Sequence, residues 1–273
     1  MRKMIYIFYR IVVFLVVLKI AFYFAEPFVF YHPVSKMEGT PGQFQLKFTE
    51  KQLVTQDGSK ISSWWIPSDS TDAPVILFCH GNAGNMSHRL SNVAALHNMG
   101  WSVIIFDYHG FGTSEGRPSE TRLYSDAKAV YEELISKGIP TEKIIWFGRS
   151  LGGAVASYGA EHFPSAGLIL ESTFTSAEGM AKYLYWPFPV QWLVWTKFPT
   201  LDRIRRIQLP LLILHGDQDS MIPIRMGKEL FEASASSSKS FHKVKGGEHN
   251  TTFSLGGTDY WNAFQNFMNG LKK

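Results

Sequence analysis

Cysteine is almost absent from this chain of 273 residues, which contains Cys79 alone. A single cysteine cannot form an intramolecular disulfide, and it cannot build a metal site made of several thiolates. Cys79 ends the apolar run Val75–Cys79, so we expect it to be a small buried hydrophobic residue. The sequence therefore excludes a disulfide-stapled scaffold and a cysteine-based zinc module.

Concentrated charge and cofactor motifs are also absent. The formal net charge is only +4 and the charged residues form no runs, which argues against a nucleic-acid partner. No two histidines have the H-E-x-x-H spacing of a zinc protease, and the glycine-rich segments match neither G-x-G-x-x-G nor a P-loop. We therefore expect no bound metal ion and no cofactor.

Long hydrophobic runs are confined to the amino terminus. Ile11–Phe30 contains fourteen Ile, Leu, Val or Phe residues, each contributing about −0.3 to −0.6 kcal/mol to membrane insertion, against about +3 kcal/mol for Lys19. Bulky residues follow the run and no Ala-x-Ala site appears, so an uncleaved signal-anchor is favoured over a cleaved signal peptide. We predict that residues 1–31 form one transmembrane helix.

The distribution of basic residues predicts the orientation of this anchor. Arg2, Lys3 and Arg10 precede the span, whereas Glu26 and His32 follow its apolar centre. The positive-inside rule then places the amino terminus in the cytoplasm and the rest of the chain on the outer side, which is periplasmic, extracellular or lumenal.

The remaining chain has the composition of one globular α/β domain. Residues 32–43 are predicted to be a linker, and residues 44–273 to be the domain. Phe44–Phe48 and Ile61–Ile66 alternate in polarity around Asp57-Gly58, which is typical of a hairpin. Later apolar runs alternate with helical patterns, the clearest being the helix around Leu123–Leu134, with Ser119 or Thr121 as its cap. This alternation predicts a doubly wound, mostly parallel sheet.

The segment Ile144–Gly153 carries the main chemical signal. Four apolar residues predict a buried strand, Gly-Arg-Ser-Leu-Gly follows, and small residues open a helix. This is the strand, turn and helix that a nucleophile elbow requires, with Ser150 at its tip. Ser150 is therefore the predicted nucleophile.

A serine nucleophile needs a histidine base, and the histidine needs an orienting carboxylate. His249 and Asp219 each follow a predicted strand and stand in the order serine, acid, histidine. Asp217 and Glu171 are the alternative acids. Of the other histidines, His80, His109 and His215 are expected to support loops by hydrogen bonds. Surface or half-buried positions are expected for His88, His97, His162 and His242.

The charge that develops on a substrate oxygen needs hydrogen-bond donors, usually two backbone N–H groups. One donor is expected at Leu151, directly after the nucleophile. The other is expected in the loop His80–Asn85, and we choose Asn82, because Gly81 and Gly84 let this backbone turn inward.

An aromatic-rich insertion interrupts the strand and helix alternation at about residues 172–207. We interpret it as a short cap over the serine and predict that Tyr183, Trp186 and Trp192 bind substrate. Packing of the cap on the sheet, or contact with lipid beside the anchor, explains these aromatic residues equally well.

Together these segments resemble a known family, the membrane-anchored α/β-hydrolase-domain serine hydrolases. The resemblance rests on HGNAGN (80–85), DYHGFG (107–112), GRSLGG (148–153), HGDQD (215–219) and GEHN (247–250). It implies an α/β-hydrolase fold with an eight-stranded sheet, a short cap and a triad at Ser150, Asp219 and His249, without a cofactor. His109 departs from the family, whose members usually carry arginine there, and we expect this to affect loop packing rather than chemistry.

The resemblance and the residues agree on a serine hydrolase that cleaves acyl esters or thioesters through an acyl-enzyme. The cap and anchor favour a fatty-acyl substrate, either a lipid-like small molecule or an acylated protein, because some members of the family remove palmitoyl groups from proteins. A peptidase or amidase of the same fold is one alternative. A membrane-tethered binding protein without catalysis is the other.

Overall fold

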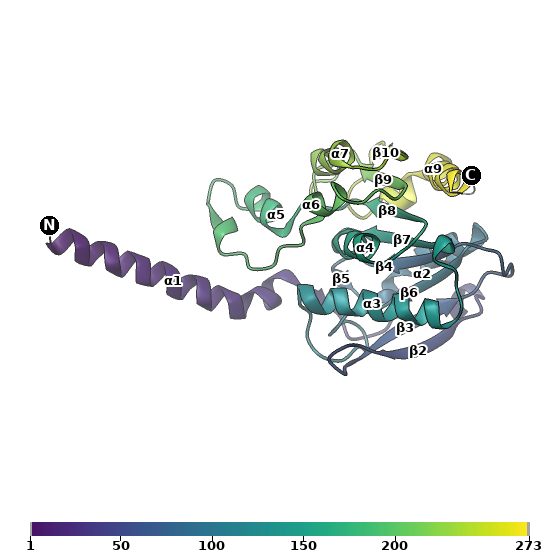
Figure 1. Ribbon diagram of the computed structural model, residues 1–273, viewed down its shortest axis with the longest axis horizontal. Coiled ribbons are helices and arrows are strands. Elements are labelled where there is room, and N and C mark those ends of the chain that lie inside the picture. Colours follow the sequence, from purple (N-terminus) through teal and green to yellow (C-terminus); the bar gives the residue numbers. More distant parts are fainter. Residues whose placement is uncertain (1, 272–273) are drawn as a thin grey trace.

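The computed structural model describes residues 2–271, and its centre is an eight-stranded sheet (Figure 1). The strands lie in the order β10-β9-β8-β7-β4-β6-β3-β2. Their bounds are β2 Thr49–Val54, β3 Lys60–Ile66, β4 Val75–Cys79, β6 Ser102–Phe106, β7 Ile144–Arg149, β8 Gly167–Glu171, β9 Leu211–Gly216 and β10 Lys239–Val244. The pairs β2–β3 and β3–β6 are antiparallel and all other pairs are parallel, which confirms the predicted mostly parallel sheet.

Helices cover both faces of this sheet. The helices of residues 2–271 are α1 Arg2–Phe30, α2 Leu90–Asn98, α3 Glu120–Ser136, α4 Leu151–His162, α5 Ala177–Leu184, α6 Thr200–Ile204, α7 Ile224–Ala233, α8 Thr252–Leu255 and α9 Gly257–Gly270. Successive strand residues point to opposite faces, so Leu77 belongs to the core under α3, α4 and α7, and Phe78 to the core under α2 and α9. Burial on both faces explains why the central strands are apolar throughout.

The helix predicted around Leu123–Leu134 forms as α3. Ser119 caps it, because its Oγ accepts a hydrogen bond from the Arg122 N–H at 3.4 Å. Its apolar stripe is buried against the sheet, and it ends at Ser136, before Gly138 in the left-handed conformation (φ 74°).

The opening hairpin differs from the expectation in one strand. Asp57-Gly58 does form its turn, but the first strand is β2 at Thr49–Val54, not Phe44–Phe48. Pro41 starts a short 3-10 helix that runs to Phe44, and Phe48 packs on Trp64 with 6.0 Å between the ring centroids. The polarity alternation of residues 44–48 therefore reflects packing on the edge of the core rather than strand pairing.

The predicted linker is docked onto the domain over its first residues. His32–Pro33 forms strand β1 and pairs in parallel with β5 (Ala83–Gly84). The Asn85 side-chain amide then donates to the carbonyls of Val34 and Lys36, both at 2.8 Å. The loop after β4 thus holds the chain where α1 ends.

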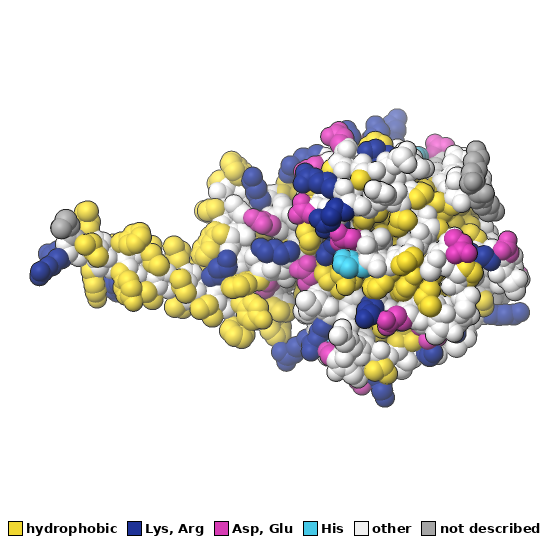
Figure 2. Space-filling model, viewed as in Figure 1, with side chains coloured by type: hydrophobic (Ala, Val, Ile, Leu, Met, Phe, Trp, Pro, Cys, Tyr) yellow, Lys and Arg dark blue, Asp and Glu magenta, His cyan; other side chains and the backbone are white. Residues whose placement is uncertain are grey.

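Helix α1 leaves the body as a long projection, and the cap helix α5 lies beside its carboxyl-terminal part (Figure 1). With 29 residues it is long and apolar enough to cross a membrane, as predicted. Figure 2 shows hydrophobic side chains along α1 and where it meets the body, with basic side chains at its free end.

Candidate active site

Ser150 stands at the turn between β7 and α4, at the carboxyl edge of the sheet. Its backbone has φ 54° and ψ −120°, a conformation that non-glycine residues rarely adopt. The turn is tight because Gly148 and Gly152 allow backbone contact: a Cβ on Gly148 would collide with the Gly152 carbonyl, and one on Gly152 with the Cys79 carbonyl. The Ser150 N–H donates to the Glu171 carbonyl at 2.9 Å, which anchors the turn to β8.

His249 and Asp219 reach Ser150 from the loops after β10 and β9. The Ser150 Oγ lies 3.1 Å from the His249 Nε2, and the His249 Nδ1 lies 2.9 Å from the Asp219 Oδ2. Both distances are hydrogen-bond distances. The structure thus brings together the three predicted side chains, which lie 99 and 30 positions apart in the chain.

Asp219 is held in its ionised form. Its other oxygen, Oδ1, accepts hydrogen bonds from the Met221 N–H (3.0 Å) and the Ile222 N–H (2.8 Å). Burial alone would raise the pKa of Asp219, but the hydrogen bond and charge of His249 and the Ile222 amide lower it below its usual value. A carboxylate in this position can fix the orientation of the imidazole and stabilise the imidazolium ion.

The alternative acids are engaged elsewhere. Asp217 accepts from the Gly246 N–H at 2.7 Å and so fixes the loop that leads to His249. Glu171 is fully buried and receives hydrogen bonds from Tyr260 (2.9 Å) and Thr252. Neither carboxylate is hydrogen-bonded to His249, so Asp219 is the acid that the geometry selects.

Two of the histidines read as loop braces lie close to this site but bond to backbone groups. The His80 Nδ1 lies 2.7 Å from the Gly81 carbonyl oxygen, and the His215 Nε2 lies 2.8 Å from the Ile222 carbonyl oxygen. Burial lowers the pKa of His215, so its ring is neutral and donates this hydrogen bond. They support the loops that carry the site.

Arg149 is a site residue that the sequence reasoning missed. Its Nη2 donates to the His249 carbonyl at 2.8 Å, and its Nε lies 3.4 Å from the Glu171 carboxylate. It therefore fixes the backbone of His249 to β7, the strand that precedes Ser150. Its position between Gly148 and Ser150 was the available signal, although the motif allows any residue there.

The two predicted oxyanion donors lie at the same cavity as Ser150 and His249. The N–H of Leu151 is in the first turn of α4, where backbone N–H groups have no partner within the helix. The backbone N–H of Asn82 makes no hydrogen bond within residues 2–271. Gly81 packs so closely that an added Cβ would lie 3.4 Å from that of Ser150.

A mainly apolar cavity of about 490 Å³ opens beside Ser150. One side is formed by the catalytic loops, one by the cap and one by α1. The cap contributes Phe174, Ala177, Met180, Ala181, Leu184, Tyr185 and Val194, and α1 contributes Phe22, Glu26, Val29 and Phe30. Arg89 also lines the cavity, with Arg149 and Asn250.

The structure does not place Tyr183, Trp186 and Trp192, the predicted substrate-binding residues, in the lining of this cavity. In α5, residues 177, 180, 181 and 184 share the face toward the cavity. Tyr183 lies off that face, and its hydroxyl donates to the Ser220 carbonyl at 3.2 Å. Trp186 and Trp192 follow the helix, and their side chains are 76% and 37% exposed.

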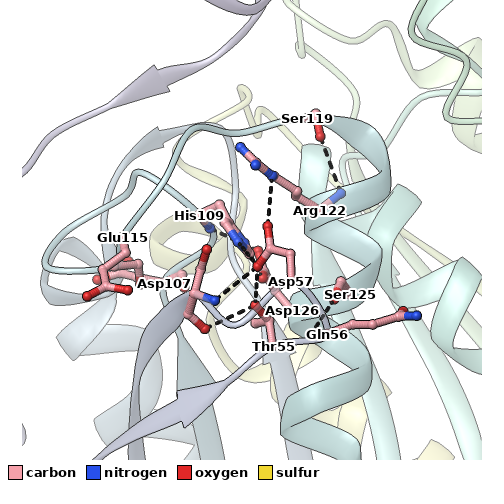
Figure 3. A network of polar contacts seen from close by, with 12 residues as sticks. Thr55, Gln56, Asp57, Asp107, His109, Glu115, Ser119, Arg122, Ser125 and Asp126 are labelled. Carbon is pink, nitrogen blue, oxygen red and sulfur yellow. Dashed lines mark hydrogen bonds and ion pairs between the residues drawn. The ribbon is translucent and has the colours of Figure 1, made fainter.

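His109 is buried, and it belongs to a polar network that reaches the surface (Figure 3). It does not line the cavity. Its Nδ1 is 2.5 Å from an Asp126 oxygen, and its Nε2 is 3.3 Å from Asp57. Arg122 completes the group with an ion pair to Asp57 at 3.2 Å. His109 thus connects the loop after β6 to α3 and the opening hairpin, in agreement with a packing role.

Comparisons with known proteins identify the family. A family model described as serine aminopeptidase, S33, matches residues 71–202 and 199–255. The alpha/beta hydrolase domain-containing protein WAV2 of Arabidopsis thaliana is 34% identical over 251 residues, covering 84% of this chain and 81% of that protein. This chain is an α/β hydrolase. The predicted family and enzyme class, a serine hydrolase, are confirmed.

The chain is also similar in sequence to a lipase and in structure to an esterase. The hydrolase is 35% identical over 209 residues to the lysophosphatidylserine lipase ABHD12 of Danio rerio, with 68% of this chain and 54% of the lipase covered. It therefore spans about half the length of that lipase. The esterase Pf2001 of Pyrococcus furiosus superposes with a TM-score of 0.71 at 21% identity, covering 87% of this chain and 96% of the esterase, and confirms the α/β-hydrolase fold.

Proposed function

We propose that this hydrolase cleaves fatty-acyl esters or thioesters through a covalent acyl-enzyme formed on Ser150. The observation that carries the proposal is the continuous hydrogen-bonded series from the Ser150 hydroxyl to the His249 ring and the Asp219 carboxylate, at the mouth of an apolar cavity. A hydroxyl, an imidazole and a carboxylate in this order make up the machinery of acyl transfer.

The reaction follows from this geometry. The Ser150 Oγ attacks the acyl carbonyl while the His249 Nε2 accepts its proton, and Asp219 stabilises the imidazolium ion through Nδ1. The N–H groups of Leu151 and Asn82 stabilise the oxyanion. The imidazolium then protonates the leaving oxygen or sulfur, and the acyl-enzyme forms. A water molecule, deprotonated by His249, releases the acid and restores Ser150.

The cavity lining supports a lipid-like substrate. Its walls on the cap and α1 are mostly aliphatic and aromatic, which suits an acyl chain. Arg89 supplies a positive charge: within residues 2–271 no carboxylate lies at ion-pair distance from it, and its Nε has no hydrogen-bond partner. Burial and the nearby charge of Arg149 lower the pKa of Arg89 to about 10, so it is charged at neutral pH. A lysophospholipid, with one acyl chain and an anionic head group, fits both features.

A peptidase acting on free amino termini is less well supported, although the matched family is described as an aminopeptidase. Such an enzyme needs a carboxylate available to bind the substrate's ammonium group. Glu26 is the acidic residue that lines the cavity, and its oxygens already accept hydrogen bonds from the Trp195 and Thr196 N–H groups. The acidic residues of the cap, Glu178 and Asp202, are exposed and do not line the cavity.

The anchor belongs to the same proposal. Glu26 of α1 is 5% exposed and bonded to the cap, which favours a retained helix over a cleaved one. We assign α1 as the membrane anchor, with the amino terminus in the cytoplasm and the hydrolase domain on the outer side, because the basic residues precede the span.

The proposal is tested with the full-length protein in detergent. Wild-type protein should react with a fluorophosphonate probe and hydrolyse nitrophenyl esters and acyl thioesters, with kcat/KM rising from acetyl to longer chains. Ser150→Ala should abolish both, because it removes the nucleophile. The alternatives make different predictions: a peptidase would prefer aminoacyl amides, and a binding protein without catalysis would leave the probe unreacted.

A further inference from the structure

The carboxyl-terminal part of α1, from Lys19 onward, is bound to the cap by specific contacts. The Glu26 carboxylate accepts hydrogen bonds from the backbone N–H groups of Trp195 (3.1 Å) and Thr196 (3.1 and 3.3 Å). The Trp195 indole donates to the Lys19 carbonyl at 3.1 Å, and the Lys19 ammonium lies 5.0 Å from the ring centroid. A helix that served only as a membrane anchor would not need a buried carboxylate bonded to the cap.

The end of α1 is bound to the opposite side of the cavity mouth. The Asn82 side-chain amide donates to the Phe30 carbonyl at 2.6 Å, and its Oδ1 accepts from the His32 N–H at 3.3 Å. Asn82 is also the residue whose backbone N–H we assign to the oxyanion hole. The helix therefore connects the cap to the catalytic loop.

The length of α1 separates a membrane part from a docked part. At 1.5 Å per residue its 29 residues extend about 44 Å, whereas a hydrocarbon core is about 30 Å thick. About a third of the helix thus extends beyond the core. Because Glu26 and Phe30 are hydrogen-bonded to the domain, we place this third at the carboxyl-terminal end, so the membrane part begins before Ile11, earlier than the sequence alone suggests. The contacts with the domain lie in this part and just before it: Lys19, Phe22, Glu26 and Phe30 are at least partly buried and recur at helical spacing.

We propose that residues 22–30 of α1 form one wall of the acyl-binding site, so that an acyl chain reaches Ser150 along the anchor directly from the bilayer. Phe22, Val29 and Phe30 line the same cavity as Ser150, facing Met180 and Leu184 of α5. A chain that moves along this wall remains in apolar surroundings from the membrane to the nucleophile. The anchor then selects the substrate as well as holding the enzyme at the membrane. This inference rests on the proposed function.

The test measures acyl-chain selectivity with the full-length protein in lipid nanodiscs. In Val29→Trp a large ring occupies the α1 wall, so kcat/KM for dodecanoyl esters should fall about ten-fold relative to butanoyl esters. Phe22→Ala removes apolar surface from that wall and should lower the same ratio about three-fold or more. The controls are Val17→Trp and Phe14→Ala, on exposed positions of α1 outside the cavity, and both should keep the wild-type ratio.

The outcomes separate this inference from the proposed function. Butanoyl hydrolysis and fluorophosphonate labelling report whether each variant is folded and active. Active Val29→Trp and Phe22→Ala enzymes with an unchanged chain-length ratio would overturn the role of α1 while leaving the esterase proposal intact. An equal change in the Val17→Trp control would also overturn it, because the effect would then come from the membrane part. Wild-type protein inert toward every ester would refute the proposed function itself.

Discussion

Ser150 illustrates how a single residue can store strain for chemistry. With φ 54° and ψ −120° it occupies a region in which a non-glycine residue costs about 1–3 kcal/mol. The surrounding structure enforces this conformation, because Gly148 and Gly152 bring β7 and α4 into backbone contact. The strain raises the hydroxyl above the sheet and toward His249.

This strain is measurable as stability. We expect the free energy of unfolding of Ser150→Gly to exceed that of Ser150→Ala by about 1 kcal/mol. Glycine adopts a positive φ without the steric strain that a Cβ causes. The larger conformational entropy of glycine in the unfolded chain offsets only part of this stabilisation. Both variants lack the nucleophile, so function does not complicate the comparison. The measurement is urea unfolding in detergent, and an alanine variant as stable as the glycine variant would show that the elbow is unstrained.

Arg89 is the residue that should decide head-group preference. Arg89→Met keeps much of the side-chain volume but removes the positive charge at the cavity, so kcat/KM for an anionic lysophospholipid should fall about ten-fold or more. Hydrolysis of an uncharged monoacylglycerol with the same acyl chain should change little. Equal losses on the two lipids would contradict the role of the charge and indicate a packing defect.

At the scale of elements, the loop after β6 is fastened to α3 by buried charge. His109 and Asp126 are fully buried and hydrogen-bonded to one another, and Asp57 and Arg122 extend the group to the surface (Figure 3). The net contribution of a buried ion pair to stability is small, because desolvation of the two charges offsets their attraction. Removing one member costs much more, because it leaves the other charge buried without a partner. The network therefore holds β6, α3 and the opening hairpin in one arrangement.

Removing one member of this pair should affect stability rather than catalysis. His109→Ala leaves the Asp126 carboxylate buried without its partner and should lower the free energy of unfolding by about 3 kcal/mol. The kcat/KM of the folded enzyme should stay within about two-fold, since His109 does not line the cavity. Urea unfolding and ester hydrolysis measure the two quantities.

The pH dependence of this variant has a definite sign. Burial already raises the pKa of Asp126, and removing His109 removes a group that lowers it. A carboxyl group with a raised pKa in the folded state favours folding at low pH and loses that contribution as pH rises through the folded pKa. The free energy of unfolding of His109→Ala should therefore rise as the pH falls from about 7 toward the pKa of an aspartate in the unfolded chain. The double variant His109→Ala/Asp126→Asn lacks the titrating group and should show no such rise.

At the scale of the whole molecule, α1 and the domain form one functional unit. The helix projects from the body at the side where the cap and the cavity lie (Figure 1). It is hydrogen-bonded to the cap through Glu26 and to the loop after β4 through Phe30. Exposed aromatic residues of the cap, including Trp186 and Phe188, lie in the segment beside it. Tryptophan in such a position is typical of the membrane interface. This arrangement agrees with the proposed action on acyl substrates at a membrane surface.

The single native cysteine makes the membrane orientation easy to measure. Cys79 is fully buried, so Ser237→Cys provides one exposed thiol on the hydrolase domain. In sealed right-side-out vesicles a membrane-impermeant maleimide should label this variant without permeabilisation, because we place the domain on the outer side. Wild-type protein should remain unlabelled throughout. Labelling that requires permeabilisation would reverse the proposed orientation.

The sequence by itself determined the sheet, the elbow and the identity of the three candidate catalytic side chains. These depend on local patterns: apolar runs encode buried strands, glycines mark the tight turn at Ser150, and loops after parallel strands all meet at one edge. The anchor helix was readable for the same reason, since its apolar length is a local property.

Only the tertiary structure decided which surfaces meet. The cavity is lined by Met180 and Leu184 rather than by Tyr183, Trp186 or Trp192, because the rotation of α5 and the path of the following loop are set by tertiary packing. Arg149 hydrogen-bonds to the His249 carbonyl, and Glu26 accepts a hydrogen bond from the Trp195 N–H. Each contact joins residues that lie about a hundred or more positions apart. Composition and periodicity describe which side chains are available in each segment, whereas contacts over such separations arise from the packing of the whole chain.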